Sequence, residues 1–214
     1  AFEFKVLPNN IGYVSLQSFE NAEVSKEFEK NFEAISGTSA LILDIRNNGG
    51  GNSSFGWSIL GMLTDKDFKT SKWHTRSYKP AFRAWGRQEE IFGEDSGDFP
   101  ADRSKYYSRP VVVLTGPATF SAAEDFAVAF DAMKRGLIIG EPTGGSTGQP
   151  LFFRLPGGGS ARVTTKRDSY PDGKEFVGRG VIPDIVVKPN IPDIRARRDT
   201  VLEAARSELA KNLK

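Results

Sequence analysis

The 214-residue chain has no cysteine and a single histidine, His74. Without cysteine it has no disulfide, no thiolate nucleophile and no cysteine-based zinc site. One histidine also excludes a metal site built from several histidines. We therefore expect no metal and no cofactor, while the lack of cysteine leaves the cellular compartment open.

Long apolar runs and a one-sided charge are missing too. No apolar run approaches the ~20 residues that a membrane-spanning helix needs, and no basic-then-apolar leader precedes Phe2. The 29 basic and 27 acidic residues give a net charge of +2, and no Lys/Arg block resembles a phosphate-binding stripe. We expect neither a transmembrane segment nor nucleic-acid binding. Because Ala1 leads almost at once into the strand-like FEFKVL, we also expect a longer parent protein whose N-terminal region is absent here.

The chain does contain an alternation of apolar runs and amphipathic stretches, which is typical of an α/β fold. A hydrophobic content of 38% allows one substantial core, and we predict a single domain over residues 1–214. Strands are predicted at residues 2–7, 12–19, 39–46, 69–79, 110–114, 136–141 and 180–187, and a hairpin at 151–165. Helices are predicted at residues 22–35, 55–63, 121–135 and 192–214. Residues 80–109 have no clear period and are predicted to be a surface insertion.

One serine stands where a buried strand meets a helix. PVVVL is a buried-strand run, and SAAEDFAVAFDAMKRG keeps apolar residues at helical spacing. Ser121 is therefore predicted at a helix N-terminus, where unpaired N–H groups and the helix dipole favour a developing negative charge. An acyl-transfer nucleophile would be placed there. Ser121 and Glu124 also form a capping-box pattern, so this segment alone fits a structural cap as well.

Glycine-rich turns follow three of the predicted strands, namely DIRNNGGG, GPATFS and GEPTGGSTG. In parallel sheets such turns gather at one edge, beyond the carboxyl ends of the strands. An amide from Gly49 or Gly50, together with the amide of Ala122, would then form an oxyanion hole. The alternative for the first turn is an ordinary tight loop held by an Asp44–Arg46 pair.

Five segments in this order, GYVSLQSF, LILDIRNNGGG, GPATFSAAEDF, IIGEPTGGS and GVIPDIVV, resemble the catalytic core of the C-terminal processing (tail-specific) serine peptidases and the tricorn-protease core. The resemblance covers nearly the whole chain and is weakest between Leu63 and Arg109. It implies a Clp-protease/crotonase-like α/β core of repeated ββα units, with a mixed sheet, flanking helices and a C-terminal hairpin. It also implies a periplasmic, cell-envelope or secreted setting.

The same resemblance implies a serine-type endopeptidase with Ser121 as nucleophile. The amide of Ala122, with that of Gly49 or Gly50, corresponds to the oxyanion hole. The reaction implied is hydrolysis of a peptide or protein substrate, bound as an extended strand, through an acyl-enzyme.

The general base is where the sequence departs from both branches of the family. The tail-specific branch has a lysine in the loop after IIGE, where this chain has Ser146. The tricorn-like branch takes a histidine from a segment N-terminal to the core, and its glutamate falls on Val177 here. His74 is a candidate base, and Ser146, Gln149 and Glu175 are candidate accessory residues.

Lysines elsewhere in the chain are not clear substitutes. Lys134 lies at the far end of the predicted helix, ~20 Å from Ser121 at ~1.5 Å per residue. Lys166 and Lys174 would approach the serine only if the hairpin folds back. We therefore expect the base to come from the absent N-terminal region, and the isolated fragment to be weakly active or inactive.

Two other functions remain open at this point. The fold and groove would also suit a non-catalytic peptide- or ligand-binding module, which the missing lysine and histidine would favour. A crotonase-like acyl-CoA enzyme shares the backbone oxyanion chemistry, but the sequence shows neither the positioned carboxylates nor the cofactor groove that it needs.

Overall fold

A six-stranded sheet in the order β1-β2-β3-β8-β9-β13 forms the centre of the computed structural model, which describes residues 2–212. Its strands are β1 (Phe2–Leu7), β2 (Ile11–Leu16), β3 (Ala40–Asp44), β8 (Val111–Thr115), β9 (Leu137–Gly140) and β13 (Ile185–Val186). The 3-10 helix η1 (Pro8–Asn10) connects β1 to β2, which pair antiparallel, and every other pairing in this sheet is parallel. The predicted α/β class with a mixed sheet is confirmed.

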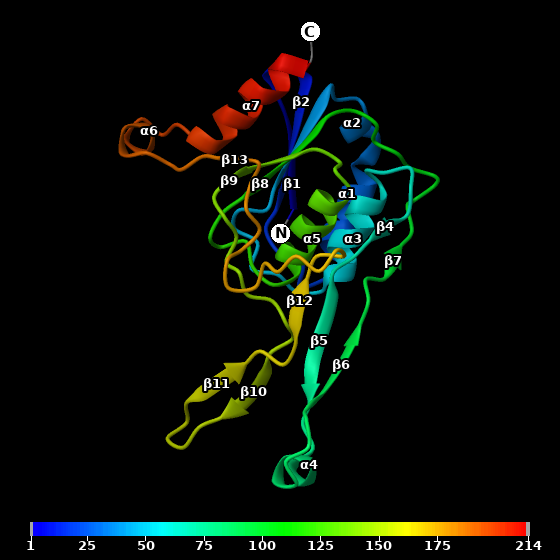
Figure 1. Cartoon of the computed structure of the whole chain (residues 1–214). Helices are drawn as coiled ribbons and strands as arrows, with labels where there is room; N and C mark the ends of the chain where they lie inside the picture. The colour runs from blue at the N-terminus through cyan, green and yellow to red at the C-terminus, as the bar shows by residue number, and fades with distance from the viewer. Residues whose placement is uncertain (1, 213–214) are drawn as a thin grey trace.

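Helices cover both faces of this sheet (Figure 1). Those on one face are α1 (Glu23–Lys30), α3 (Ser53–Gly61) and α5 (Ala122–Ala132), and α7 (Thr200–Asn212) lies on the other. In β3, Leu41 and Leu43 join the first core, whereas Ile42 joins the second core with residues of α7. Because both faces are covered, β3 and β8 are continuous apolar runs rather than alternating ones.

Helix α5, which begins just after Ser121, is buried along most of its length. All residues from Ala122 to Phe130 are buried. Its neighbour α3 approaches closely because Gly56 has no side chain: a Cβ there would lie 3.1 Å from the Phe126 ring. The tight packing fixes the position of the helix N-terminus relative to the sheet.

Two β-structures project from the body of the molecule in the same direction (Figure 1). The first, which we call the arm, consists of β5 (Lys72–Ser77), α4 (Pro80–Ala84) and β6 (Glu90–Glu94), with β12 (Arg167–Ser169) paired to β5. The second is the predicted hairpin, formed by β10 (Leu151–Arg154) and β11 (Ser160–Val163). A separate pair, β4 (Phe68–Lys69) and β7 (Asp98–Phe99), joins the arm to the body.

Residues 80–109, predicted as a surface insertion without a clear period, contain regular structure. β6 pairs antiparallel with β5, and α4 forms the tip between them. The strand was missed because its five residues are all exposed, so that no apolar alternation marks it. The assignment of residues 1–214 to a single domain stays a prediction.

Two predicted elements are shorter than expected because local side chains or proline interrupt them. The helix predicted at residues 22–35 divides into α1 and α2 (Phe32–Ser36), since Asn31 Nδ2 donates to the Glu27 carbonyl at 2.8 Å and ends the first helix. The strand predicted at residues 180–187 is reduced to β13. Pro183 lies within it, and proline has no N–H for a sheet hydrogen bond.

The predicted C-terminal helix, residues 192–214, is likewise two helices, α6 (Ile191–Arg195) and α7. Asp193 binds Arg198 and Thr200 across the break, with Thr200 Oγ1 donating at 2.7 Å. Residues 213–214 of the prediction lie outside the described residues.

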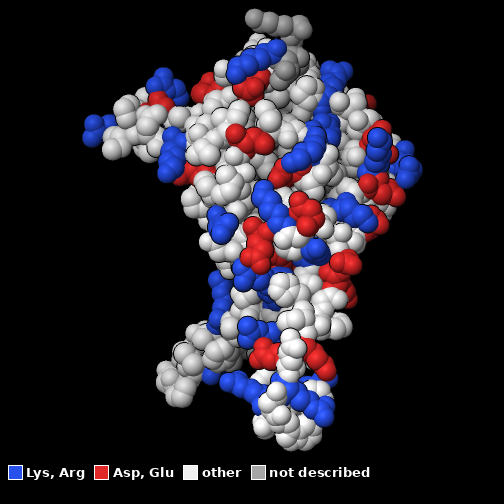
Figure 2. Space-filling model, in the orientation of Figure 1, with Lys and Arg blue, Asp and Glu red and all other residues white. Residues whose placement is uncertain are grey.

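Lys and Arg are interspersed with Asp and Glu over the face shown in Figure 2. One ion-pair network is partly buried: Arg46 joins the end of β3 to the start of α7. Its Nη2 donates to Asp44 Oδ2 at 2.6 Å and to Asp199 Oδ2 at 2.7 Å. Tyr13 also donates its hydroxyl to Asp44 at 2.7 Å, and burial together with the Asp44 charge raises the pKa of that tyrosine. The predicted Asp44–Arg46 pair is thus present.

Replacing Arg46 should loosen α7 from the sheet. Arg46→Ala leaves Asp44 7% exposed and without its cation. Because Arg46 itself is partly exposed, we expect a loss of about 2–3 kcal/mol in the free energy of unfolding, less than the ~3–5 kcal/mol of a fully buried pair. Urea unfolding measures this. The control is Arg76→Ala, whose arginine is 75% exposed in its pair with Glu89 and should change stability by less than ~0.5 kcal/mol. Equal losses in the two variants would contradict this account.

Candidate active site

Ser121 has a backbone conformation that few L-residues adopt. Its φ of 55° and ψ of −125° are those of the first central residue of a type II′ turn, a position that normally favours glycine. Such conformations cost ~1–3 kcal/mol and persist only where surrounding structure imposes them. The predicted position at the N-terminus of α5, after β8, is confirmed.

Asn48 holds the Asn-Gly-Gly corner against Ser121. Its buried side chain donates to the Leu16 carbonyl at 2.9 Å and accepts from the Gly50 N–H at 2.9 Å. Its own carbonyl accepts the Phe120 N–H at 3.0 Å. Asn48 therefore connects β2, the turn after β3 and the turn that carries the serine.

The three predicted amides differ in whether they are free. The Gly50 N–H is bound to Asn48, so it is not available to a ligand; this corrects the alternative that assigned the amide to Gly50. Within residues 2–212 the N–H groups of Gly49 and Ala122 have no acceptor. Gly50 has a spatial role instead, since a Cβ there would lie 2.7 Å from Ser121 Cβ and 3.0 Å from Ala122 N.

Glu124 connects the first turn of α5 to the loop after β9. Although it is fully buried, Oε1 accepts from Thr143 Oγ1 and the Gly145 N–H at 2.6 Å, and Oε2 accepts from the Ser146 N–H at 2.8 Å. The Ser121 N–H, 3.3 Å from Oε2, completes the Glu124 half of the predicted capping box. Burial raises the pKa of Glu124, and these hydrogen bonds partly oppose that effect.

Both halves of the predicted capping box are present, with the Glu124 N–H facing the Ser121 side chain as well. The same N–H lies 2.7 Å from the backbone carbonyl of Ser121, so the serine side chain is not its only acceptor. The Ser121 N–H also approaches the Ser146 carbonyl, at 3.2 Å. Both loops are thereby fixed around the hydroxyl by backbone groups and one carboxylate.

Glu124→Gln should release the loop at residues 143–146. Both oxygens of the Glu124 carboxylate accept hydrogen bonds, whereas the NH2 group of a glutamine side chain can only donate. The N–H or O–H groups that face this NH2 would lose their acceptor, and each unmade buried hydrogen bond costs ~1–3 kcal/mol. We expect faster hydrogen exchange in residues 143–148 and a stability loss in that range. Glu141→Gln is the matched control, because Glu141 is in the same loop and its side chain makes no hydrogen bond within residues 2–212. Unchanged exchange in Glu124→Gln would refute the role.

Ser121 opens onto two cavities. One, of about 570 Å³, is also lined by Gly49, Ser146 and Arg162, and Arg162 is the only charged residue lining it. We call it the Arg162 cavity. The other, of about 590 Å³, extends to Asp125, Lys166 and Asp168, and we call it the acidic cavity.

Buried polar groups line the floor of the acidic cavity. Asp125, one turn after Ser121, accepts from Ser53 Oγ at 2.6 Å and from Ser71 Oγ at 3.2 Å. Lys166 donates to Asp168 Oδ1 at 2.6 Å. Burial, with the charge of Asp168 as a further cause, raises the pKa of Asp125 to about 6; the serine hydroxyls and Lys166 act in the opposite direction.

Asp125 therefore gives the fold a defined pH dependence. Its folded pKa of about 6 lies above the unfolded value of ~3.9, so the folded state binds more protons between these values. The contribution of Asp125 to the free energy of unfolding is fully present below pH ~4 and is lost as the pH rises through about 6. Asp125→Asn should consequently be more stable than the parent above pH ~7, by about 2–3 kcal/mol, and equal to it below pH ~4.

Urea titrations from pH 4 to pH 8 test this difference between parent and variant. Asp98→Asn serves as the control, because Asp98 is 65% exposed in its pair with Lys69. A pH-independent difference for Asp125→Asn would show that the carboxyl does not titrate in this range.

Two of the predicted residues are not brought to Ser121. His74 is exposed on β5, opposite Arg167 of β12, and lines a separate pocket on the arm. Glu175 is also exposed and pairs with Arg167 at 2.7 Å. Neither lines either cavity at Ser121, so the structure corrects the prediction that they belong to this site.

The other predicted residues do line the site. Ser146 faces the Arg162 cavity, and Gln149, at a positive φ of 46°, lines the acidic cavity. Lys166 reaches the acidic cavity because the chain returns from the β10–β11 hairpin into β12. Val177, where a glutamate occurs in the tricorn-like branch, packs against the hydrophobic core.

Asn48, Asp125 and Asp168 were not singled out in the sequence. Asn48 lies inside the DIRNNGGG segment, so the motif itself was the available signal. The two aspartates are far apart in sequence and meet only because β12 pairs with β5 beside α5. No local pattern marks such a contact.

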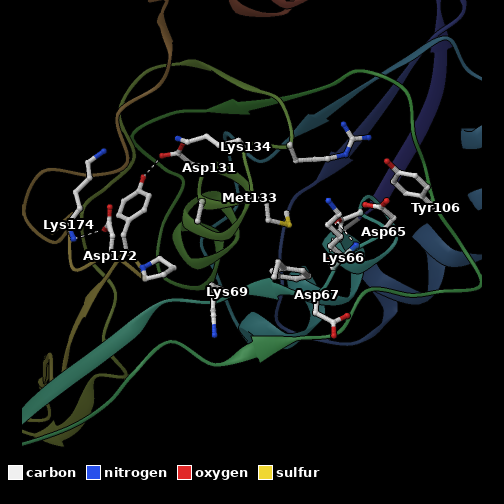
Figure 3. Close-up of a pocket in the computed structure, with 16 residues that line it drawn as sticks. Asp65, Lys66, Asp67, Lys69, Tyr106, Asp131, Met133, Lys134, Asp172 and Lys174 are labelled. Carbon is white, nitrogen blue, oxygen red and sulfur yellow. Dashed lines mark hydrogen bonds and ion pairs between the residues drawn. The ribbon is translucent and has the colours of Figure 1, made fainter.

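A larger cavity, of about 720 Å³, lies at the opposite end of α5 (Figure 3). Asp131, Lys134 and Lys174 line it, and Tyr170 donates its hydroxyl to Asp131 at 2.9 Å. Since both lysines lie at this end of the helix, the structure places neither beside Ser121. This cavity, although larger than the two at Ser121, therefore does not lie where the glycine-rich turns meet.

The sequence and the fold both match known peptidases. The family model of peptidase family S41 matches residues 10–187. A chloroplastic C-terminal processing peptidase from Tetradesmus obliquus is 31% identical over 183 residues, which cover 85% of this chain and 36% of that protein. The solved photosystem II D1 C-terminal processing protease is similar with a TM-score of 0.65 and 28% identity, over 89% of this chain and 48% of that one.

The tricorn protease is similar in fold alone, with a TM-score of 0.62 and 20% identity over 95% of this chain and 18% of that chain. The resemblance predicted from the sequence is confirmed. The chain spans about a third to less than half of the length of the curated relatives that it matches. Among residues 2–212, no helix combines the length and apolar character needed to cross a membrane.

Proposed function

Since the chain belongs to peptidase family S41, we propose that it is the core of a serine-type endopeptidase that hydrolyses peptide or protein substrates through an acyl-enzyme. Ser121 is the nucleophile. The observation that carries this proposal is the left-handed backbone of Ser121 at the start of α5, which points to a strained turn between two cavities. A serine that served only as a helix cap would need neither the strain nor the openings.

The amides of Gly49 and Ala122 are the donors of the oxyanion hole. Both lack an acceptor within residues 2–212, and Gly49 lines the same cavity as the serine. Gly50 supports the hole by close packing, because a Cβ at this position would lie 3.0 Å from Ala122 N. Donors already in place stabilise a developing oxyanion without reorganising as the charge appears.

Ser146 and Glu124 position the nucleophile. The Ser121 N–H approaches both the Ser146 carbonyl and the Glu124 carboxylate, so the turn is anchored on its amide side. Gln149, exposed at the acidic cavity, would contact substrate rather than the serine.

The base comes from a part of the protein beyond this chain. Lys166 shares a cavity with Ser121, but its Nζ donates to Asp168 Oδ1 at 2.6 Å and makes no hydrogen bond to Ser121 within residues 2–212. His74 is exposed on the arm. The matched relatives are two to three times as long as this chain, which leaves room for an N-terminal region that supplies the base. We expect the isolated chain to have little or no activity.

Substrate binding as an extended strand agrees with the exposed edges of the β10–β11 hairpin beside the cavities, because a peptide can add to such an edge. An extracytoplasmic setting, periplasmic, cell-envelope or secreted, accords with the chloroplastic processing peptidases among the relatives.

One observation favours a second function, a non-catalytic peptide-binding module. Ser146 occupies the place of the tail-specific lysine, and Lys166 is paired with Asp168. Such a protein would bind peptides in the same cavities without turning them over.

The nucleophile can be tested on the full-length protein with a fluorophosphonate probe. We expect covalent labelling of Ser121 and peptide hydrolysis, and Ser121→Ala should lose both, with activity falling by at least ~10³-fold. Mass spectrometry locates the label.

Ser104→Ala is the matched control, because Ser104 lies on the surface and its Oγ bonds only locally, to Asp102 at 2.6 Å. Labelling and hydrolysis that persist in Ser121→Ala would refute the nucleophile. Peptide binding without labelling or turnover in the full-length protein would identify the binding module instead.

A further inference from the structure

The acidic cavity has an unbalanced set of charges. Among its described lining residues, Lys166 is the one cation. Four carboxylates line it as well, namely Glu94, Asp95, Asp125 and Asp168. Glu94 and Asp95 are exposed at the end of β6, and neither forms an ion pair within residues 2–212. The cavity therefore keeps negative charge that the described protein does not neutralise.

An unpartnered oxygen lies at the bottom of this cavity. The Asp168 side chain is 2% exposed, and its Oδ1 is bound by Lys166. Within residues 2–212 its Oδ2 has no hydrogen-bond partner. A buried acceptor without a donor is costly, and a charged N–H donor would remove that cost.

Two tryptophans provide aromatic surface beside these carboxylates. Trp57 and Trp73 both line the cavity, and Lys166 Nζ already lies 5.3 Å from the centre of the Trp73 ring. Ring faces attract ammonium and guanidinium groups.

An organic cation fits this cavity better than a metal ion. Within the described residues, no group of three His, Cys, Asp or Glu side chains is arranged to hold a metal. The carboxylates are instead spread from the mouth to the floor of a cavity of about 590 Å³. This distribution suits a long side chain that carries its charge at the end.

The position of Ser121 sets where such a side chain would lie. Because the serine lines both cavities, a peptide held across it places one flanking residue toward each. The Arg162 cavity has one positive charge, and the acidic cavity has excess negative charge. The two sides of the bond are therefore not equivalent.

We propose that the acidic cavity selects a lysine or arginine side chain of the substrate, at the residue next to the scissile bond. Glu94 and Asp95 attract the cation at the mouth, and Asp168 Oδ2 accepts from it at the floor. This inference rests on the proposed function for the location of the bond, but binding of the basic residue does not require turnover.

Binding to the full-length protein with Ser121→Ala tests the inference separately from catalysis. Fluorescence polarisation compares fluorescein-labelled peptides that differ at one position: lysine, arginine, glutamine or citrulline. We expect the basic peptides to bind about tenfold more tightly than their neutral counterparts, as one charge-assisted hydrogen bond would give. The double variant Glu94→Gln/Asp95→Asn should lower that preference about two- to threefold, because it removes the charges at the mouth and leaves Asp168 in place.

The matched control is Glu89→Gln/Glu90→Gln, on the same arm but paired with Arg76 and Lys79 outside the cavity. It should retain the full preference for basic peptides. Equal binding of basic and neutral peptides, or equal loss in the two double variants, would overturn the inference while leaving the nucleophile untouched. Failure of Ser121 to label, with the binding preference intact, would instead reject the peptidase and keep the cation site.

Discussion

The four hydrogen bonds to Glu124 are the contacts on which the arrangement around Ser121 depends. One buried carboxylate accepts from the loop after β9 and from the serine amide at the start of α5. Because α5 is buried along most of its length, this carboxylate fixes a glycine-rich loop to a buried helix. Backbone hydrogen bonds add to this anchor, from the Gly144 N–H to the Thr119 carbonyl at 2.9 Å and from the Gly178 N–H to the Gly145 carbonyl at 2.6 Å.

The strained conformation of Ser121 becomes understandable in that setting. Asn48 holds the turn after β3, and Glu124 holds the turn after β9, so the serine turn is bounded on both sides. Gly50 can approach it closely only because it has no side chain. Surrounding contacts of this number can sustain a backbone conformation that costs ~1–3 kcal/mol. Among the described residues 2–212, the Gly49 and Ala122 amides are left without acceptors, which is the property that an anion site requires.

The sequence predicts the parts of this site that are local. Apolar runs predict β3 and β8, helical spacing predicts α5, and glycine after a strand predicts the turns, because each depends on neighbouring residues. The arm was missed because β6 is exposed and gains its pairing only from β5. The broken helices depend on single side chains, Asn31 and Asp193, that compete for backbone or cross-turn hydrogen bonds. The choice between Gly49 and Gly50 required the Asn48 contact.

The segment that leads from the β10–β11 hairpin into β12 bears on two questions, the source of the base and the binding of substrate. It brings Lys166 to the cavity at Ser121, yet it also brings Asp168, whose Oδ1 accepts from this lysine at 2.6 Å. Within residues 2–212 the other oxygen of Asp168 has no donor. In our proposals the base comes from beyond this chain, and the same segment supplies part of the negative charge of the acidic cavity. Recognition of substrate and activation of the serine are therefore assigned to different parts of the protein.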